Sequence, residues 1–192
     1  MAEILDPNPG PGPDPILPEE ADPLIFGPPL TWWRDYVKRA GRLPARSDFI
    51  PEDLPPQPLR YILLIDIGLN ADRLRFRLVG TAHCDFNRRD FTGLYFEDIY
   101  PPGSLALDYI KGLYREMIEA RTPIWSVNDF PHPATGHAMT MRRLMLPFSS
   151  GGEHVDLCLA VQIPGDREQG AREEPNPWHS TPSVKERARM RL

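Results

Sequence analysis

The sequence has few cysteines, no long apolar segment and no excess of basic residues. Only two of its 192 residues are cysteines, Cys84 and Cys158, too few for a disulfide framework or a paired-cysteine metal site. No run of about 18 apolar residues occurs, which predicts that no helix spans a membrane. The first ten residues lack the charged and then apolar plan of a secretory signal. Together these absences predict a cytoplasmic protein with reduced thiols.

The charge balance and the missing motifs also exclude classes of function. The formal net charge of -5 argues against nucleic-acid binding, because a domain that binds nucleic acid is normally basic. The sequence contains no G-x-x-x-x-G-K-[ST] phosphate loop and no glycine-flanked serine nucleophile. We therefore predict no catalytic residues and no enzymatic activity.

Proline is the residue type in excess, and its placement suggests the domain organisation. The chain has 24 prolines, and many fall in the first thirty residues, where they favour an extended backbone. We expect residues 1–29 to be a disordered tail, residues 30–163 to form one domain, and residues 164–192 to be a disordered charged tail. The basic end, VKERARMRL, could be solvated or form a helix on a partner or an anionic surface.

An aromatic helix is expected at the start of the domain. Thr31 can cap it and Gly41 can end it, and its apolar side carries Trp32, Trp33 and Tyr36. Two adjacent tryptophans on a short helix need a cover, either the outer face of a sheet or a second subunit. Because exposed aromatic patches mark contacts, these three residues are the predicted interface.

The rest of the domain predicts an α+β fold with five antiparallel strands. Residues 61–67 and 73–79 form a hairpin; Leu74, Phe76 and Leu78 alternate with a row of arginines. A polar loop, a helical turn and a long helix capped by Ser104 follow. Three more strands are expected at residues 124–130, 137–148 and 154–163. Because no strand–helix–strand unit repeats, a doubly wound parallel sheet is not expected.

Several motifs resemble one family. WW followed by GRLPARSDF, RFRLVGT, RRDFTG, RLMLPFSSGG and VDLCLAV resemble a bacterial (alphaproteobacterial-type) PAS subfamily over residues 31–163. The resemblance implies a PAS-like five-stranded antiparallel sheet that joins the first two strands to the last three, with helices on one face and an N-terminal helix. It also implies a sensory or protein-interaction module, often dimeric through a helix packed on the sheet, and it assigns no ligand.

Known cofactor chemistry does not match these residues. Flavin photosensors of the PAS type place Asn before their reactive Cys, whereas His83 precedes Cys84 here. Haem-binding PAS sensors commonly take a histidine from the helix before the third strand, and residues 104–121 contain none. The run His83, Cys84 and Asp85 is too contiguous for one metal ion, and His132 and His137 lack clear partners. We predict no metal site, and the cofactor is left unknown.

A ligand pocket is predicted from the loop after the hairpin and its flanking elements. Its candidate residues are Phe76, Leu78, His83, Tyr114, Trp125 and Met141. The row of Arg73, Arg75 and Arg77 could bind an anion or an acidic partner, or protect an edge strand from pairing with other sheets. Arg143 lies among apolar residues and, if buried, needs a carboxylate, for which Asp66 and Asp90 are candidates.

The leading hypothesis is a cytoplasmic PAS-type signalling module that acts by protein–protein interaction, with or without a small ligand in its cavity. Its partners would be a second copy in a homodimer, a signalling protein, or both. Two alternatives stay open, a dedicated receptor for a small molecule or cofactor such as haem or flavin, and a structural dimeric scaffold.

Overall fold

The protein is described from a computed structural model. The structure describes residues 16–100, 103–131, 138–152, 154–164 and 185–192. The predicted disorder of residues 1–15 and 165–184, and the histidines His132 and His137, therefore lie outside the described residues.

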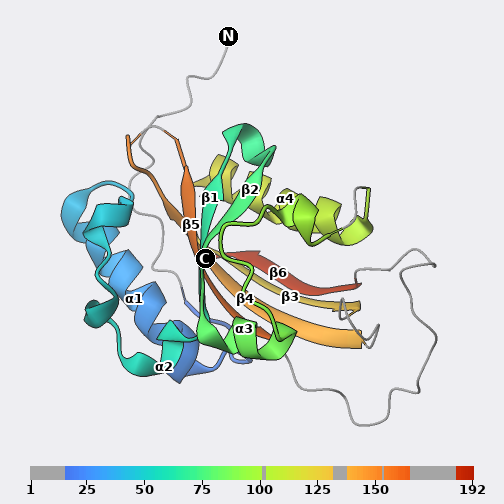
Figure 1. Ribbon diagram of the computed structural model, residues 1–192. Coiled ribbons are helices and arrows are strands. Elements are labelled where there is room, and N and C mark those ends of the chain that lie inside the picture. Colours follow the sequence, from blue (N-terminus) through green and yellow to red (C-terminus); the bar gives the residue numbers. More distant parts are fainter. Residues whose placement is uncertain (1–15, 101–102, 132–137, 153, 165–184) are drawn as a thin grey trace.

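The centre of the fold is one antiparallel sheet of six strands (Figure 1). Its spatial order is β2-β1-β5-β4-β3-β6, with every neighbouring pair antiparallel. The strands are β1 (Ile62–Ile67), β2 (Leu74–Val79), β3 (Ile124–Pro131), β4 (Ala138–Phe148), β5 (Leu157–Pro164) and β6 (Lys185–Arg191). This order confirms the predicted α+β fold, in which the first hairpin joins the last three predicted strands in one sheet.

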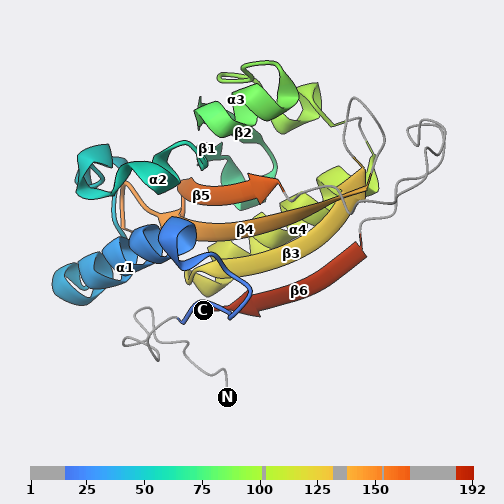
Figure 2. The ribbon, with the colours of Figure 1, turned by 90° about the horizontal axis from the view of Figure 1, so that it is seen from below.

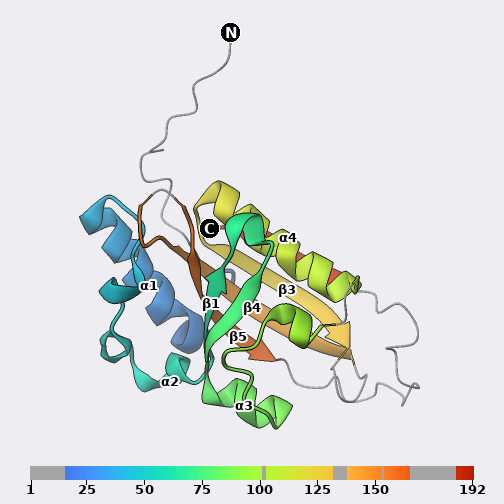
Figure 3. The ribbon, with the colours of Figure 1, turned by 45° about the horizontal axis from the view of Figure 1, so that its top comes forward.

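Helices cover both faces of the sheet. Figure 2 shows α1 in front of the strands and α4 behind them, and α4 runs along β3 in Figure 3. The helices are α1 (Pro23–Ala40), α2 (Pro56–Leu59), α3 (Thr81–Asn87) and α4 (Leu105–Ala120). Short 3-10 turns are η1 (Arg46–Asp48), η2 (Pro51–Asp53), η3 (Leu69–Ala71) and η4 (Phe96–Asp98).

A side-chain cap and a left-handed residue set the two ends of the α4 helix. The Ser104 hydroxyl accepts a hydrogen bond from the Leu107 amide at 3.2 Å, as predicted for the cap. Its apolar stripe is buried at Ile110, Leu113 and Met117, and a left-handed Arg121 closes the C-terminus. A helix with one such stripe covers the sheet on one side only.

The α1 helix starts earlier than predicted. Residues 23–29, expected to belong to a disordered tail, form its first turns. The Asp22 carboxylate accepts from the Leu24 amide at 2.9 Å, and Pro23 occupies the first turn, where its missing N–H costs nothing. Phe26 is fully buried, and its burial explains why the helix tolerates the prolines at 28 and 29.

Two further segments differ from the predictions. The polar loop expected after Gly80 contains the helix α3. The C-terminal residues 185–191, expected as part of a solvated tail or a helix on a partner, form strand β6 on the edge of β3. Arg189 and Arg191 of β6 each pair with Glu116 of α4 at 3.0 Å. Because backbone hydrogen bonds and ion pairs hold β6, its sequence has little of the apolar pattern that predicts a strand.

Candidate functional site

A cavity lies between the sheet and the segment that carries α3, η4 and α4. Its volume is about 70 Å³, enough for several water molecules or a small organic molecule. It is lined by Leu63, Phe76, His83, Phe86, Asn87, Phe91, Phe96, Ile99, Tyr100, Ile110, Tyr114, Met141, Arg143 and Gln162. The four neighbouring strands β2, β1, β5 and β4 each contribute a side chain, so the site exists only in the assembled fold.

Aromatic rings form one wall of the cavity. The ring of Phe76 stacks on Phe96 with centroids 4.3 Å apart and meets the edge of Phe91 at 4.6 Å. Phe96 in turn meets Tyr114 of α4 at 5.9 Å, in an edge-to-face arrangement. Such pairs fix ring positions beyond what burial alone does, so the wall has a defined shape.

Four of the six predicted pocket residues line this cavity: Phe76, His83, Tyr114 and Met141. Leu78 does not, because a bulge interrupts the pairing of β1 with β2. Ile65 pairs with Phe76 but Leu64 pairs with Leu78, so one extra residue turns Leu78 to the other side of the sheet. Leu78 is consequently 42% exposed, and its assignment to the pocket is wrong.

Trp125 also lies outside the cavity. It pairs with Leu144 of β4, whereas the cavity residues Met141 and Arg143 point to the opposite face of that strand. Its ring meets the edge of Phe26 from α1 at 4.8 Å and is fully buried there. Trp125 therefore belongs to the core under α1, and its assignment to the pocket is wrong.

His83 is held as a neutral imidazole in the cavity wall. Its side chain is buried, and its Nε2 lies 3.2 Å from the Tyr61 carbonyl oxygen, so Nε2–H can donate to that oxygen. Burial lowers the pKa of His83 to about 4; the Tyr61 and Gln162 carbonyls oppose this shift, and the positive charge of Arg143 adds to it. Its neighbours diverge, since Cys84 lies against Val79 and Asp85 pairs with Arg60. Within the described residues, no three His, Cys, Asp or Glu side chains gather as metal ligands would.

Arg143 is a buried cation to which no carboxylate of the described residues is paired. Its side chain is 5% exposed, and its Nε donates to the Gln162 Oε1 at 2.7 Å. Its Nη1 is buried and has no hydrogen-bond partner in the described structure. Neither predicted acid pairs with it, because Asp66 binds Arg77 at 2.6 Å and Asp90 accepts from the Thr92 amide.

The surface row of arginines belongs to an edge strand. Strand β2 is the last strand on its side of the sheet, and the arginines beside it are exposed. Arg77 pairs with Asp66, Arg75 donates to the Gly93 carbonyl at 3.3 Å, and Arg73 lies over the Tyr95 ring at 3.9 Å. These contacts favour the protective role predicted for the row.

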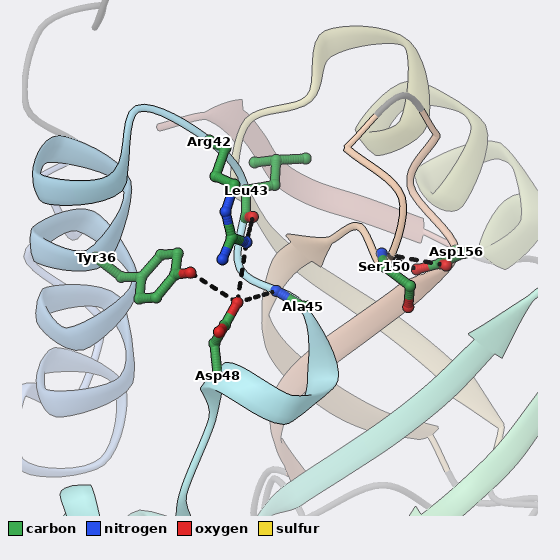
Figure 4. Close-up of polar contacts among 7 residues, drawn as sticks. All are labelled: Tyr36, Arg42, Leu43, Ala45, Asp48, Ser150 and Asp156. Atoms are coloured by element: carbon green, nitrogen blue, oxygen red, sulfur yellow. Dashed lines mark hydrogen bonds and ion pairs between the residues drawn. The ribbon is translucent and has the colours of Figure 1, made fainter.

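A second polar cluster, outside the cavity, orders the segment after α1 (Figure 4). The Asp48 carboxylate accepts from the Tyr36 hydroxyl at 2.6 Å, from Arg42 Nη1 at 2.9 Å and from the Ala45 amide at 2.8 Å. These hydrogen bonds lower the pKa of Asp48 to about 2. Ser150 and Asp156 in the same view join the two sides of the β4–β5 connection.

The predicted aromatic interface is largely covered by the chain itself. Trp33 is 5% exposed and its Nε1 donates to the Pro147 carbonyl at 2.8 Å, while Trp32 stacks on Phe148 at 5.9 Å. Tyr36 is buried as well. The outer face of the sheet is thus the observed cover of the two tryptophans, and only Trp32 remains partly accessible.

The sheet order and the helices on both faces define a domain of the α+β class. In a comparison with models of protein families, residues 30–161 match the PAS domain. The chain therefore belongs to the PAS domain family, whose members are sensory and interaction modules. A search of curated proteins gives no match. Within the described residues, no helix is both long enough and apolar enough to cross a membrane.

Proposed function

We propose that the protein is a cytoplasmic signalling module that senses a small ligand in the cavity and passes the signal on through protein contacts. The observation that carries this proposal is the cavity itself. It combines an ordered aromatic wall with polar side chains from β4, β5 and α3, among them the buried Arg143 and His83. A core that served only for stability would fill this space with apolar side chains.

The pocket chemistry supports sensing and not catalysis. The His83 imidazole is fixed against a backbone carbonyl, and burial raises the pKa of the Cys158 thiol to about 12, so neither group is poised to transfer a proton or to attack a substrate. The free thiols of Cys84 and Cys158 are consistent with a reducing compartment.

The cavity size bears on the alternative of a haem or flavin receptor. Pockets for drug-sized ligands have volumes of roughly 300–1,000 Å³, and this cavity, at about 70 Å³, is several times smaller. A macrocycle or a three-ring flavin would require α3 and η4 to move away from the sheet. A ligand of a few non-hydrogen atoms fits without that change.

The experiment that tests the proposal compares the purified protein before and after unfolding and dialysis. We expect native mass spectrometry to show added mass on the untreated chain, and the refolded, stripped protein to melt at a lower temperature, because a ligand that binds only the folded state stabilises it. The stripped protein should regain its melting temperature when the extracted small molecules are returned. A clean chain mass together with identical melting curves would contradict ligand sensing and favour the scaffold alternative.

We propose in addition that α1 contributes to a homodimer or to a contact with a signalling protein. Trp32 is partly accessible, and Leu24, about two turns earlier on the same helix, is 71% exposed. Sedimentation of Trp32→Ala and Leu24→Ala, with Leu69→Ala on a distant exposed site as control, tests it. A homodimer through α1 predicts a lighter species for the first two variants only, and a monomeric wild type would exclude the homodimer.

A further inference from the structure

The cavity contains a positive charge that the described chain does not neutralise. A guanidinium is always charged, and a buried charge normally has a partner of opposite sign because its removal from water is costly. Arg143 has only the neutral amide of Gln162, and its Nη1 donors are unsatisfied. The native site is therefore complete only when something accepts those donors.

A second unpaired group stands beside the guanidinium. Ser126 of β3 lies directly opposite Arg143 in the β3–β4 pairing, so the two side chains share one face of the sheet. Ser126 is fully buried, and its hydroxyl oxygen has no hydrogen-bond partner in the part of the chain that the structure describes. Two adjacent strands thus carry donors side by side on one face of the sheet.

Three tyrosines, His83 and Cys158 lie close enough to be affected by the charge of Arg143, and all five are uncharged. Arg189 of β6, which shares this face of the sheet, is already paired with Glu116 and Glu186. Burial is the main cause of the raised pKa values of Tyr100, Tyr109 and Tyr114, and the charge of Arg143 opposes each shift. His83 is neutral and Cys158 is protonated at pH 7. Within the described residues, no Asp or Glu side chain forms an ion pair with Arg143, so this part of the chain does not supply the missing negative charge.

We propose that the cavity binds a small monocarboxylate, whose carboxylate accepts from Arg143 and whose short apolar body lies against the aromatic wall of Phe76, Phe96 and Tyr114. Guanidinium and carboxylate are geometrically matched, and the aromatic wall adds apolar contact. The volume of about 70 Å³ limits the apolar part to a few carbon atoms. This inference rests on the proposed function and names the ligand class of the same cavity.

The test is a calorimetric titration of the stripped full-length chain with matched acids and amides. The probes are propionate and butyrate, each with its neutral amide, and inorganic phosphate as an anion without an apolar body. We expect at least one acid to bind at least tenfold more tightly than its amide and than phosphate, because a charge-assisted hydrogen bond discriminates by roughly this factor or more.

Variants assign the binding to Arg143. Arg143→Met should weaken the acid roughly tenfold or more, whereas Arg142→Met, the same change one residue away on the other face of β4, should not. Arg143→Lys keeps the positive charge but loses the planar pair of N–H donors of the guanidinium, so it should bind the acid with intermediate affinity. If Arg143→Met does not fold, as judged by circular dichroism, Arg143→Lys together with Gln162→Glu, which supplies the carboxylate internally, makes the same distinction.

The outcomes separate this inference from the proposed function. If acids and amides bind equally well, or if the Arg142 and Arg143 variants lose the same affinity, the cavity does not recognise a carboxylate. The protein could then still sense a neutral ligand, so the proposed function would stand. If phosphate binds as tightly as the acids, the proposed contact between the apolar part of the ligand and the aromatic wall is wrong. If no probe binds and no co-purified molecule is found, both proposals fail together.

Discussion

The Nε of Arg143 donates to the Oε1 of Gln162 at 2.7 Å, and the two residues are direct partners across strands β4 and β5. This cross-strand bond ties the guanidinium to the neighbouring strand, and Nη1 has no partner among the described residues. A neutral amide orients the cation without cancelling its charge. The pair therefore positions a charge for an incoming group.

The first prediction concerns this pair. Gln162→Glu should raise the free energy of unfolding by about 1 kcal/mol at pH 7, because it turns a neutral hydrogen bond into a charge-assisted one. The gain should be present above the unfolded pKa of glutamate, about 4.3, and be lost as the pH falls below it. Urea unfolding measures it. Gln162→Leu, which removes the bond, should instead be less stable by about 1–3 kcal/mol; a Glu variant no more stable than wild type would show that the Arg143 charge is already neutralised.

The second prediction concerns His83. Its folded-state pKa of about 4 lies below the unfolded value near 6.5, so only the unfolded chain takes up a proton between these values. The stability that this difference contributes is fully present above pH 6.5 and should fall by up to about 3 kcal/mol as the pH approaches 4. His83→Gln should flatten this part of the pH profile of urea midpoints. His154→Gln, on the exposed turn before β5, should leave it unchanged; equal profiles for both variants would contradict the buried neutral imidazole.

The third prediction concerns Asp48. Its three hydrogen bonds lower its pKa to about 2, so its contribution should be present above pH 4 and disappear as the pH falls towards 2. Asp48→Asn should lower the free energy of unfolding by roughly 1–2 kcal/mol at pH 7, after allowance for partial exposure. Thermal or urea unfolding at pH 7 and pH 3 measures the loss and its decline. Glu52→Gln, the same charge change on the exposed η2, is the control and should have little effect at either pH.

The fourth prediction concerns β6. Glu116 of α4 forms ion pairs with two arginines of this strand, Arg189 and Arg191, and so links β6 to α4 through side chains. Glu116→Gln should speed hydrogen exchange of the β6 amides, while global stability falls by less than about 1 kcal/mol because these ion pairs are partly exposed. Glu119→Gln, on the exposed side of α4, should not change exchange. Unchanged protection in the Glu116 variant would mean that backbone pairing alone retains the strand.

The fifth prediction compares two glycines. A Cβ at Gly80 would collide with the Arg60 carbonyl and lie 2.8 Å from the Ile62 carbonyl oxygen. Gly80→Ala should therefore destabilise the protein by about 3 kcal/mol or more. A Cβ at Gly112, within α4, meets nothing within 4 Å, so Gly112→Ala should stabilise by about 0.5–1 kcal/mol through helix propensity. Melting temperatures of the two variants, measured side by side, should move in opposite directions.

Local pattern was sufficient for the elements with strong periodicity. The apolar stripe and the Ser104 cap predict α4, and the two strands around Gly68 predict the β1–β2 hairpin. The motifs also led to the correct family and sheet. The signals for β6 and for the first turns of α1 were too weak, because the former is held by backbone pairing and Glu116 and the latter by the burial of Phe26.

The candidate site was predictable only in part. In a regular strand, Leu78 would lie on the same face of the sheet as Phe76, two positions earlier. The bulge in β2, which the sequence does not reveal, places Leu78 on the opposite face. Gln162 was missed because the connection between β4 and β5 is too long to fix their register, and that register alone makes it the partner of Arg143. Phe91, Phe96 and Asn87 were missed because they reach the cavity from segments whose packing no periodicity shows.

By itself, the sequence determined the family, five of the six strands of the sheet and the presence of a cation in an apolar strand, because these follow from motifs, alternation and residue identity. The tertiary structure alone decided that this cation lies in a cavity where none of the described acids pairs with it. That outcome depends on strand register and on the packing of α3, η4 and α4 over the sheet, which join residues far apart in the chain.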